Sequence, residues 1–272
     1  MAQMGFGAHS ECDYINSDRD SSAFRFRDGP PANAYPCALG IAAAWDDDYA
    51  ADIGHWLAEE AKAKNVHVIL GPTLNMQRSP LGGRGFESFS EDPVLCGRIA
   101  GAYVRGMQAN GAAATPKHFV CNDQEFERQS SDSEYPNIAR HCHNILTLAG
   151  IVSIRALREI YLEPFRIMQK IGNPRAYMTG YNRLNGLHVS EHHWLLTKVL
   201  REEWGFDGCV MSDWTGIYST DISIKAGMDL EMPGPPVFRG QQIERQLGCG
   251  KLAEYDLDPC VKSVSVVCHR IG

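Results

Sequence analysis

The sequence predicts an α/β fold, a TIM-type (β/α) barrel that is incomplete at its N-terminal strand. Short apolar runs that suit buried strands alternate along the chain with longer segments of helical periodicity, a pattern typical of parallel β/α architecture. One of these runs, at residues 208–211, leads directly into Ser212, Asp213 and Trp214. A (β/α) barrel presents its catalytic groups at the carboxyl ends of strands, which is where this carboxylate would lie.

Five strands and four helices account for most of this pattern. The expected strands span residues 66–70, 112–119, 175–182, 208–212 and 227–233. The expected helices span residues 45–64, 93–108, 153–170 and 191–204. Consecutive acids at Asp46, Asp47 and Asp48 suit the positive amino-terminal end of the first helix. Asp92 as the cap and Pro93 as the first residue predict the start of the second helix.

Composition limits the class of protein. The 272 residues are enough for one barrel, and a hydrophobic content of 44% supports a buried core. A net charge of −7 argues against nucleic acid or an anionic membrane as a partner, and no apolar run is long enough to span a membrane. No secretory leader is visible and the nine cysteines form no C-x-x-C pair. These features favour a cytoplasmic location, an expectation that a longer N-terminus would change.

Polar side chains gather where the expected strands end. Arg84 follows the first strand, and Lys117 and His118 end the second. Tyr181 ends the third, and Asp213 follows the fourth. If the strands are parallel, these groups converge on one rim and form a site for a small polar ligand. A lone Asp after a strand is more often a cap than a catalytic group, so the interpretation depends on the whole set.

Five motifs, taken together, resemble glycoside hydrolase family 3, and within it the β-glucosidases of fungi and bacteria. They are L-G-G-R-G-F-E-S-F-S-E-D-P at residues 81–93, T-P-K-H-F at 115–119, M-T-G-Y-N-R-L-N-G at 178–186, V-M-S-D-W at 210–214 and L-E-M-P-G at 230–234. They follow the family's order within residues 35–239. The resemblance implies that residues 28–272 form the family's N-terminal barrel-like domain, preceded by an irregular arm at residues 1–27.

The resemblance also implies a role for each matching residue. Asp213 would be the nucleophile of a retaining mechanism and would form a covalent glycosyl-enzyme. Small β-glucosides or oligosaccharides would be the substrates. The residues that contact the sugar would be Arg84, Lys117, His118, Met178, Tyr181, Trp214 as an aromatic wall, and Asp28 in the D-G-P segment. Glu87, Asp229 and Glu231 would orient these groups or pair with Arg84.

No pattern in the chain predicts a cofactor or a metal ion. His141, Cys142 and His143 include two imidazoles, but no further ligands follow at a metal-binding spacing. The glycine pairs near residues 5–7 and 82–83 fit no motif that cradles phosphate. We therefore expect neither a cofactor nor a metal ion at the site.

The chain departs from the family at three places. Asp28 begins a D-G-P segment whose following Asn and Arg are missing, and a competing alignment leaves Asp18 as its nearest substitute. Residues 134–150 interrupt a segment that is nearly continuous in the family, and either a retained intron or a surface loop would account for them. No segment resembles the family's α/β sandwich domain, which supplies the acid/base Glu, so we assign no acid/base residue.

The leading interpretation is a β-glucosidase-type retaining domain that releases terminal β-D-glucose through a glycosyl-Asp213 intermediate. The alternative is a truncated, catalytically incomplete carbohydrate-binding remnant, because retaining hydrolysis needs a second carboxylate about 5–5.5 Å from the first. A β-xylosidase specificity stays open as well, because the shape of the pocket is not visible in a sequence.

The first prediction concerns association. A barrel that lacks its first strand has an open edge beside the next strand, and unpaired strand edges recruit other chains. We therefore expect the isolated chain to self-associate, which size-exclusion chromatography with light scattering would detect as oligomers. A monodisperse monomer with a cooperative melt would contradict this expectation.

Overall fold

The computed structural model describes residues 32–125 and 152–271. The expected arm at residues 1–27, Asp28 and the insertion at residues 134–150 lie outside the described residues. In chain order the elements are α2 Ala38–Ala42, α3 Asp47–Ala63, β1 Val68–Ile69, η1 Gly85–Glu87, α4 Pro93–Ala109, β2 Ala113–Ala114, α6 Ile154–Ala156, η2 Leu157–Tyr161, α7 Glu163–Gly172, β3 Ala176–Met178, β4 Arg183–Leu184, β5 Leu187–His188, η3 Val189–Glu191, η4 Trp194–Glu203, β6 Cys209–Met211, α8 Asp221–Ala226, α9 Gln241–Gly248 and α10 Glu254–Ile271.

The strands form a parallel series in which each segment pairs with the next. β1 pairs with β2, and β3 pairs with β6, both in parallel. Isolated parallel bridges join Phe119 to Thr179 and Met211 to Leu230, so the series extends across all five expected strand regions. The α/β class and the parallel arrangement are thereby confirmed. Among the described residues the series stays open and does not close into a barrel, because no pairing joins the segment around Leu230 to β1.

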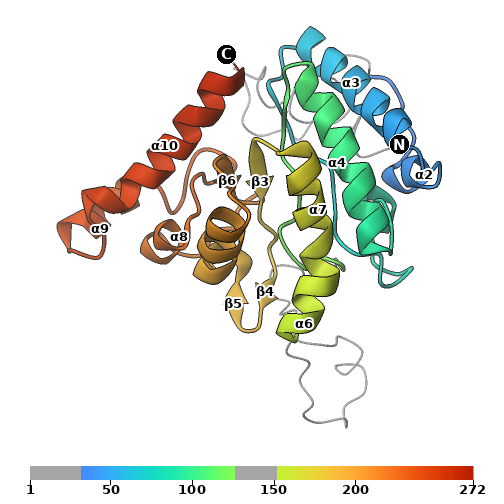
Figure 1. Cartoon of the computed structure of the whole chain (residues 1–272). Helices are drawn as coiled ribbons and strands as arrows, with labels where there is room; N and C mark the ends of the chain where they lie inside the picture. Colours follow the sequence, from blue (N-terminus) through green and yellow to red (C-terminus); the bar gives the residue numbers. More distant parts are fainter. Residues whose placement is uncertain (1–31, 126–151, 272) are drawn as a thin grey trace.

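The parallel series has two apolar faces, because successive side chains of a strand point to opposite sides. Ile69, Tyr177 and Val210 belong to the main core, which they share with α3, α4 and α7. The opposite face forms a second cluster that includes one residue of α10. Its buried members are Leu70, Ala176, Met178, Cys209, Met211 and Val267. In Figure 1, α4 and α7 lie on one side of β3 and β6, and α10 lies on the other.

The helix α4 begins at Pro93, as the sequence predicts, and α3 begins at Asp47, two residues after its predicted start. Asp46 accepts hydrogen bonds from two amide groups in the first turn of α3, at 2.9 and 3.0 Å. Asp92 does the same in α4, with both bonds at 2.8 Å, and Pro93 is the first residue of that helix. Each cap satisfies amide groups that have no partner within the helix and contributes about 1 kcal/mol to stability.

The third and fourth helices differ from the prediction. In place of one helix over residues 153–170, α6, the π-helical turn η2 and α7 follow one another. Pro164 lacks an amide hydrogen and its ring disturbs the preceding turn, and the amide of Leu162 donates to Leu157, five residues back, at 2.8 Å. The fourth helix, the π-helical η4, begins at Trp194 because residues 189–191 form the separate 3₁₀ turn η3.

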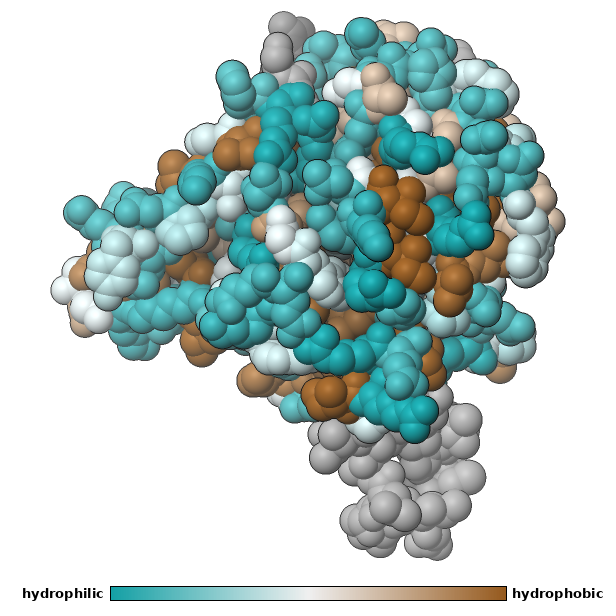
Figure 2. Space-filling view, viewed as in Figure 1, coloured by the Kyte–Doolittle hydropathy of each residue, from teal (hydrophilic) through white to brown (hydrophobic). Residues whose placement is uncertain are grey.

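The surface seen in the view of Figure 1 mixes apolar and polar side chains. Figure 2 shows small apolar areas scattered among hydrophilic residues on this face. In the part of the chain that the structure describes, no helix combines the length and the apolar character needed to cross a bilayer.

The packing of α3 on α4 depends on two glycines. A Cβ atom at Gly106 would lie 1.9 Å from the carbonyl oxygen of Ala51, and one at Gly54 would lie 2.2 Å from that of Tyr103. No carbon atom fits at such distances from a backbone oxygen, so the two helices approach each other only because both positions lack a side chain.

We predict that Gly106→Ala lowers the free energy of unfolding by about 2–3 kcal/mol, because the added methyl group forces the two helices apart. Gly248→Ala is the matched control, since a Cβ atom there meets nothing within 4 Å and should be neutral or slightly stabilising. Thermal and urea denaturation measure both changes. Equal stability of the two variants would show that α3 and α4 repack without cost.

Candidate active site

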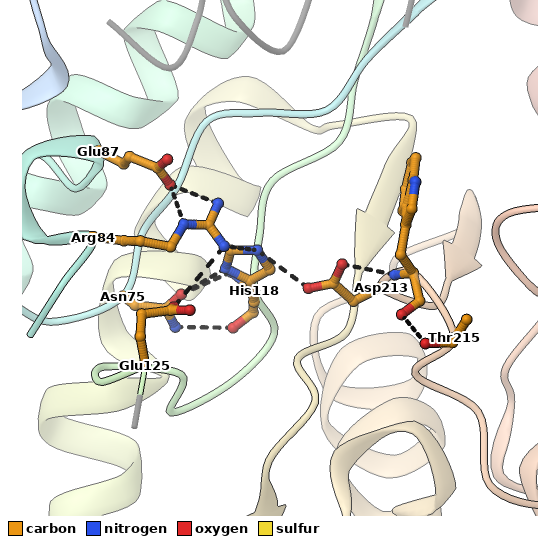
Figure 3. Close-up of polar contacts among 8 residues, drawn as sticks. Asn75, Arg84, Glu87, His118, Glu125, Asp213 and Thr215 are labelled. Atoms are coloured by element: carbon orange, nitrogen blue, oxygen red, sulfur yellow. Dashed lines mark hydrogen bonds and ion pairs between the residues drawn. The ribbon is translucent and has the colours of Figure 1, made fainter. Parts of the chain in front are cut away.

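Asp213 lies just past the carboxyl end of β6, where the chain leaves the sheet. The amide of Ser212 still donates to the carbonyl of Leu230 at 2.9 Å, so strand pairing fixes the preceding residue. Beyond it, the amide of Gly216 donates to the carbonyl of Asp213 at 2.9 Å. The amide of Trp214 donates to Asp213 Oδ1 at 2.7 Å. The turn thus holds one carboxylate oxygen, and Figure 3 shows the other pointing towards the neighbouring strand end.

His118 faces this carboxylate from the segment that follows β2. Its Nε2 lies 3.4 Å from Asp213 Oδ2, and both side chains are buried. The same Nε2 lies 3.4 Å from Arg84 Nη1. Figure 3 shows the imidazole ring between the guanidinium and the carboxylate. Arg84, His118 and Asp213 thus form a continuous row across the ends of the parallel series, and we call them the polar row below.

Two further carboxylates hold Arg84. Its Nε and Nη2 donate to Glu87 Oε2 at 3.0 and 2.7 Å, and Glu125 Oε1 lies 3.9 Å from Nη1. Burial lowers the pKa of Arg84, but the charges of Glu87, Glu125 and Asp213 outweigh it and leave that pKa raised. Burial raises the pKa of Glu87, and the cations of Arg84 and Lys117 offset this only in part. Arg84 is therefore a fixed cation, and its pairing with Glu87 is one that the sequence predicts.

The other predicted sugar-contacting residues lie at the same end of the series. Lys117 is buried directly before His118. Met178 is the last residue of β3 and belongs to the second cluster, against which the partly buried Trp214 also packs. Tyr181 is buried three residues beyond β3. Six of the seven predicted sugar-contacting residues therefore lie at the same end of the parallel series as Asp213, and the seventh, Asp28, lies outside the described residues.

Asp229 and Glu231 support the backbone and do not pair with Arg84. Asp229 Oδ2 accepts hydrogen bonds from the amide of Val210 at 2.7 Å and from Arg201 Nη2 at 2.6 Å, which ties the fifth strand region to β6. Glu231 accepts the amides of residues 237–239 at 2.9 to 3.2 Å. Both acids therefore position backbone segments near the site, and the expected role of orienting the sugar-contacting groups stays a prediction.

Three residues at this rim escaped the sequence analysis, namely Asn75, Glu125 and Tyr218. Tyr218 stacks on His188 with ring centroids 3.6 Å apart, and its hydroxyl donates to the carbonyl of Tyr181 at 3.2 Å. Burial raises the pKa of Tyr218, and the negative charge of Asp213 raises it further. Asn75 could have been found as a polar residue that follows the first strand, whereas no spacing signal marks Tyr218.

No metal centre is formed by the residues that the structure places. Across residues 32–125 and 152–271, no three His, Cys, Asp or Glu side chains are arranged to hold a metal ion. The chemistry available at the rim is therefore that of carboxylates, an imidazole, a guanidinium and aromatic faces, which together suit recognition of a polyhydroxylated ligand.

The chain was compared with the models of known protein families. Residues 23–267 match the family model described as Glycosyl hydrolase family 3 N terminal domain. The chain belongs to glycosyl hydrolase family 3. The family resemblance expected from the five sequence motifs is thereby confirmed.

Curated relatives agree with this assignment. A protein named probable β-glucosidase I from Neosartorya fischeri is 49% identical over 240 residues, and one of the same name from Aspergillus clavatus is 50% identical over 240 residues. Both alignments cover 88% of this chain and 27% of the relative. The chain thus spans about a quarter of the length of the curated relatives it matches.

Solved structures share the fold. The β-glucosidase from Kluyveromyces marxianus in complex with glucose matches with a TM-score of 0.82 and 47% identity, over 90% of this chain and 28% of that one. β-Glucosidase 3B from Thermotoga neapolitana, also in complex with glucose, matches with a TM-score of 0.80 and 39% identity, over 94% of this chain and 34% of that one. The described fold is therefore that of part of a family 3 β-glucosidase-like protein.

Asp229 gives the domain a measurable pH dependence. Burial raises its pKa to about 6, although Arg201 and the amide of Val210 lower it, whereas an aspartate in an unfolded chain has a pKa of about 3.9. Between about pH 4 and pH 6 the folded state binds more protons than the unfolded state, so stability falls as pH rises through this window. The full difference corresponds to about 3 kcal/mol.

Asp229→Asn should remove this pH dependence, because the amide does not titrate. We predict that the unfolding free energy of the parent chain, minus that of Asp229→Asn, falls as pH rises from about 4 to about 6 and then levels off. Urea denaturation over this range measures the difference. A difference that increases with pH would mean that the Arg201 contact favours the ionised carboxylate more than burial opposes it.

Proposed function

We propose that this chain is the nucleophile-bearing domain of a β-glucosidase-type retaining glycoside hydrolase, with Asp213 as the nucleophile. In this proposal the open parallel series belongs to a (β/α) barrel that is incomplete at its N-terminal strand. The observation that carries the proposal is the buried contact of Asp213 Oδ2 with His118 Nε2, at 3.4 Å. It places a carboxylate beside an imidazole at the carboxyl ends of parallel strands, which is where (β/α) barrels carry their active sites.

The proposed reaction uses the carboxylate directly. An oxygen of Asp213 bonds to the anomeric carbon while the glycosidic bond breaks, and the bonding electron pair leaves with the aglycone oxygen. The Trp214 amide on Oδ1 orients the carboxylate. The negative charge of this carboxylate raises the pKa of the nearby Arg84, so the two groups attract each other.

The sugar is held by the groups around this carboxylate. Arg84 and Lys117 supply hydrogen-bond donors for its hydroxyls, and the imidazole of His118 supplies a further hydrogen-bonding group. Met178, Tyr181 and Trp214 supply apolar or aromatic surface for its ring. The named complexes of the Kluyveromyces and Thermotoga proteins with glucose support a hexose as the ligand.

A second candidate function is sugar binding without turnover. Two other carboxylates at this rim, Glu87 and Glu125, both face Arg84. A retaining mechanism also needs a carboxylic acid that protonates the leaving group. If neither serves, the chain forms a glycosyl-enzyme only from substrates whose aglycone leaves without a proton, and ordinary disaccharides bind without being cleaved.

The decisive experiment is intact-mass spectrometry after incubation with 2-deoxy-2-fluoro-β-D-glucosyl 2,4-dinitrophenolate. Its leaving group departs without protonation, and the fluorine slows hydrolysis of the glycosyl-enzyme, so we expect the parent chain to gain one fluoroglucosyl group. Asp213→Ala should gain none. Asp48→Ala, which changes an exposed aspartate on α3, should be labelled like the parent.

Three outcomes separate the candidates. Label on a residue other than Asp213, or no label on a folded chain, would refute the proposed nucleophile. Faster labelling by the corresponding fluoroxylosyl reagent would favour a β-xylosidase specificity. Loss of acid catalysis costs about 10²–10⁴-fold in rate, so labelling with cellobiose hydrolysis near background would favour binding without turnover.

A further inference from the structure

Asn75, a buried residue that the proposed mechanism does not use, contacts His118 at three points. Its Nδ2 donates to the backbone carbonyl of His118 at 2.9 Å, and its Oδ1 accepts the backbone amide of His118 at 2.9 Å. The same Oδ1 lies 3.3 Å from the ring nitrogen Nδ1. In Figure 3 the amide lies against the backbone of His118, on the side of the imidazole away from Asp213.

The two backbone bonds decide which end of the Asn75 amide faces the ring. A backbone N–H can only donate and a backbone carbonyl can only accept. A flipped amide would therefore lose both bonds, and its orientation does not depend on an assumption about the ring. The atom beside Nδ1 is an oxygen with two lone pairs, enough for the backbone amide and for one further donor. Nδ1 must carry a hydrogen to complete the contact.

A proton on Nδ1 determines the state of the other ring nitrogen, Nε2. A neutral imidazole carries one proton, so a proton on Nδ1 leaves Nε2 as an acceptor. Nε2 lies between the donor Arg84 Nη1 and the acceptor Asp213 Oδ2, at 3.4 Å from each. We propose that Asn75 is a positioning residue that holds His118 in the Nδ1–H tautomer, so that the nitrogen beside Asp213 is the one that gains and loses a proton.

This arrangement gives His118 two uses at the same atom. As an acceptor, Nε2 can receive a hydrogen bond from a sugar hydroxyl or from Arg84. As a donor, after protonation, it can hydrogen-bond the carboxylate of Asp213. The tautomer itself follows from the contacts of Asn75 alone, whereas its effect on the reaction rests on the proposed function.

Nitrogen NMR tests the tautomer without any need for turnover. Two-bond ¹H–¹⁵N spectra of the full chain, labelled with ¹⁵N-histidine, distinguish Nδ1–H, Nε2–H and doubly protonated rings. The signals of His118 are assigned by their loss in His118→Gln. In the parent chain we expect the Nδ1–H tautomer once the ring is neutral, and on acidification we expect Nε2 to gain the proton.

Two variants separate positioning from simple support of the fold. Asn75→Ala and Asn75→Asp both lose the bond to the His118 carbonyl, but Asn75→Asp keeps an acceptor beside Nδ1. We expect Asn75→Asp to retain the Nδ1–H tautomer and Asn75→Ala to move towards Nε2–H. Gln169→Ala removes another buried amide, in α7, whose bonds are to Tyr177 and Asn173, and it should leave the His118 signals unchanged.

Several results would overturn the proposal. These are an Nε2–H tautomer in the parent chain or in Asn75→Asp, a parent ring that stays doubly protonated up to about pH 10, and an unchanged tautomer in a folded Asn75→Ala. If Asn75→Ala does not fold, the parent chain and Asn75→Asp still decide between the tautomers.

Labelling of Asp213 by the fluoroglucosyl reagent provides a separate readout. It should slow roughly 10-fold in Asn75→Ala, as when other residues that orient a functional imidazole are removed, and less in Asn75→Asp. A parent chain that shows the Nδ1–H tautomer but takes no label would refute the proposed function and leave the role of Asn75 intact.

Discussion

The register between the parallel strands determines the geometry of the rim. Met178 lies opposite Met211 in the pairing of β3 with β6, and both side chains point into the second cluster. A slip of β6 by one residue would turn Val210 out of the main core. It would also move Asp213 by about 3.3 Å along the strand, which is as long as its contact with His118. The burial of apolar side chains on both faces of the sheet therefore fixes the distance between Asp213 and His118.

Burying charge at this rim is possible only because the charges compensate one another. Arg84 faces Glu87, Glu125 and the imidazole of the polar row, so its desolvation is offset by hydrogen bonds and opposite charge. A second pair, Arg78 Nε with Asp123 Oδ2 at 3.0 Å, joins the segments that follow β1 and β2. These two segments carry the residues that contact His118 and Arg84. The ion pairs therefore hold loops together as well as balancing charge.

Sequence reasoning succeeded where the signal was local or repeated. The caps at Asp46 and Asp92 depend on neighbouring amides, and the strands depend on apolar runs, so both could be predicted. The convergence of Arg84, His118 and Asp213 followed from parallel strands ending at one rim. The split of the third helix could have been expected at Pro164, whose missing amide hydrogen is visible in the sequence.

The remainder depends on contacts between distant segments. Asn75 reaches His118 across 43 residues, and Asp229 turns to the backbone of Val210 instead of to Arg84, neither of which a linear pattern encodes. The close approach of α3 to α4 at Gly54 and Gly106 likewise depends on two segments that are distant in the sequence. From the sequence alone, a glycine within a helix indicates only a less stable helix. Its role in packing becomes visible once the residue that faces it is known.

The helix α10 lies far in sequence from the strands that it covers. Val267 completes the second cluster, Arg175 Nη1 donates to the carbonyl of Arg270 at 3.2 Å, and Arg270 pairs with Asp207 at 2.9 Å. Arg175 directly precedes β3, and Asp207 lies two residues before β6. The helix α10 is therefore attached to the amino ends of these strands, opposite the polar row. A shorter piece that stops before Glu254 would leave one side of β3 and β6 exposed to water. A piece of this chain must therefore include α10 if both faces of the sheet are to be covered.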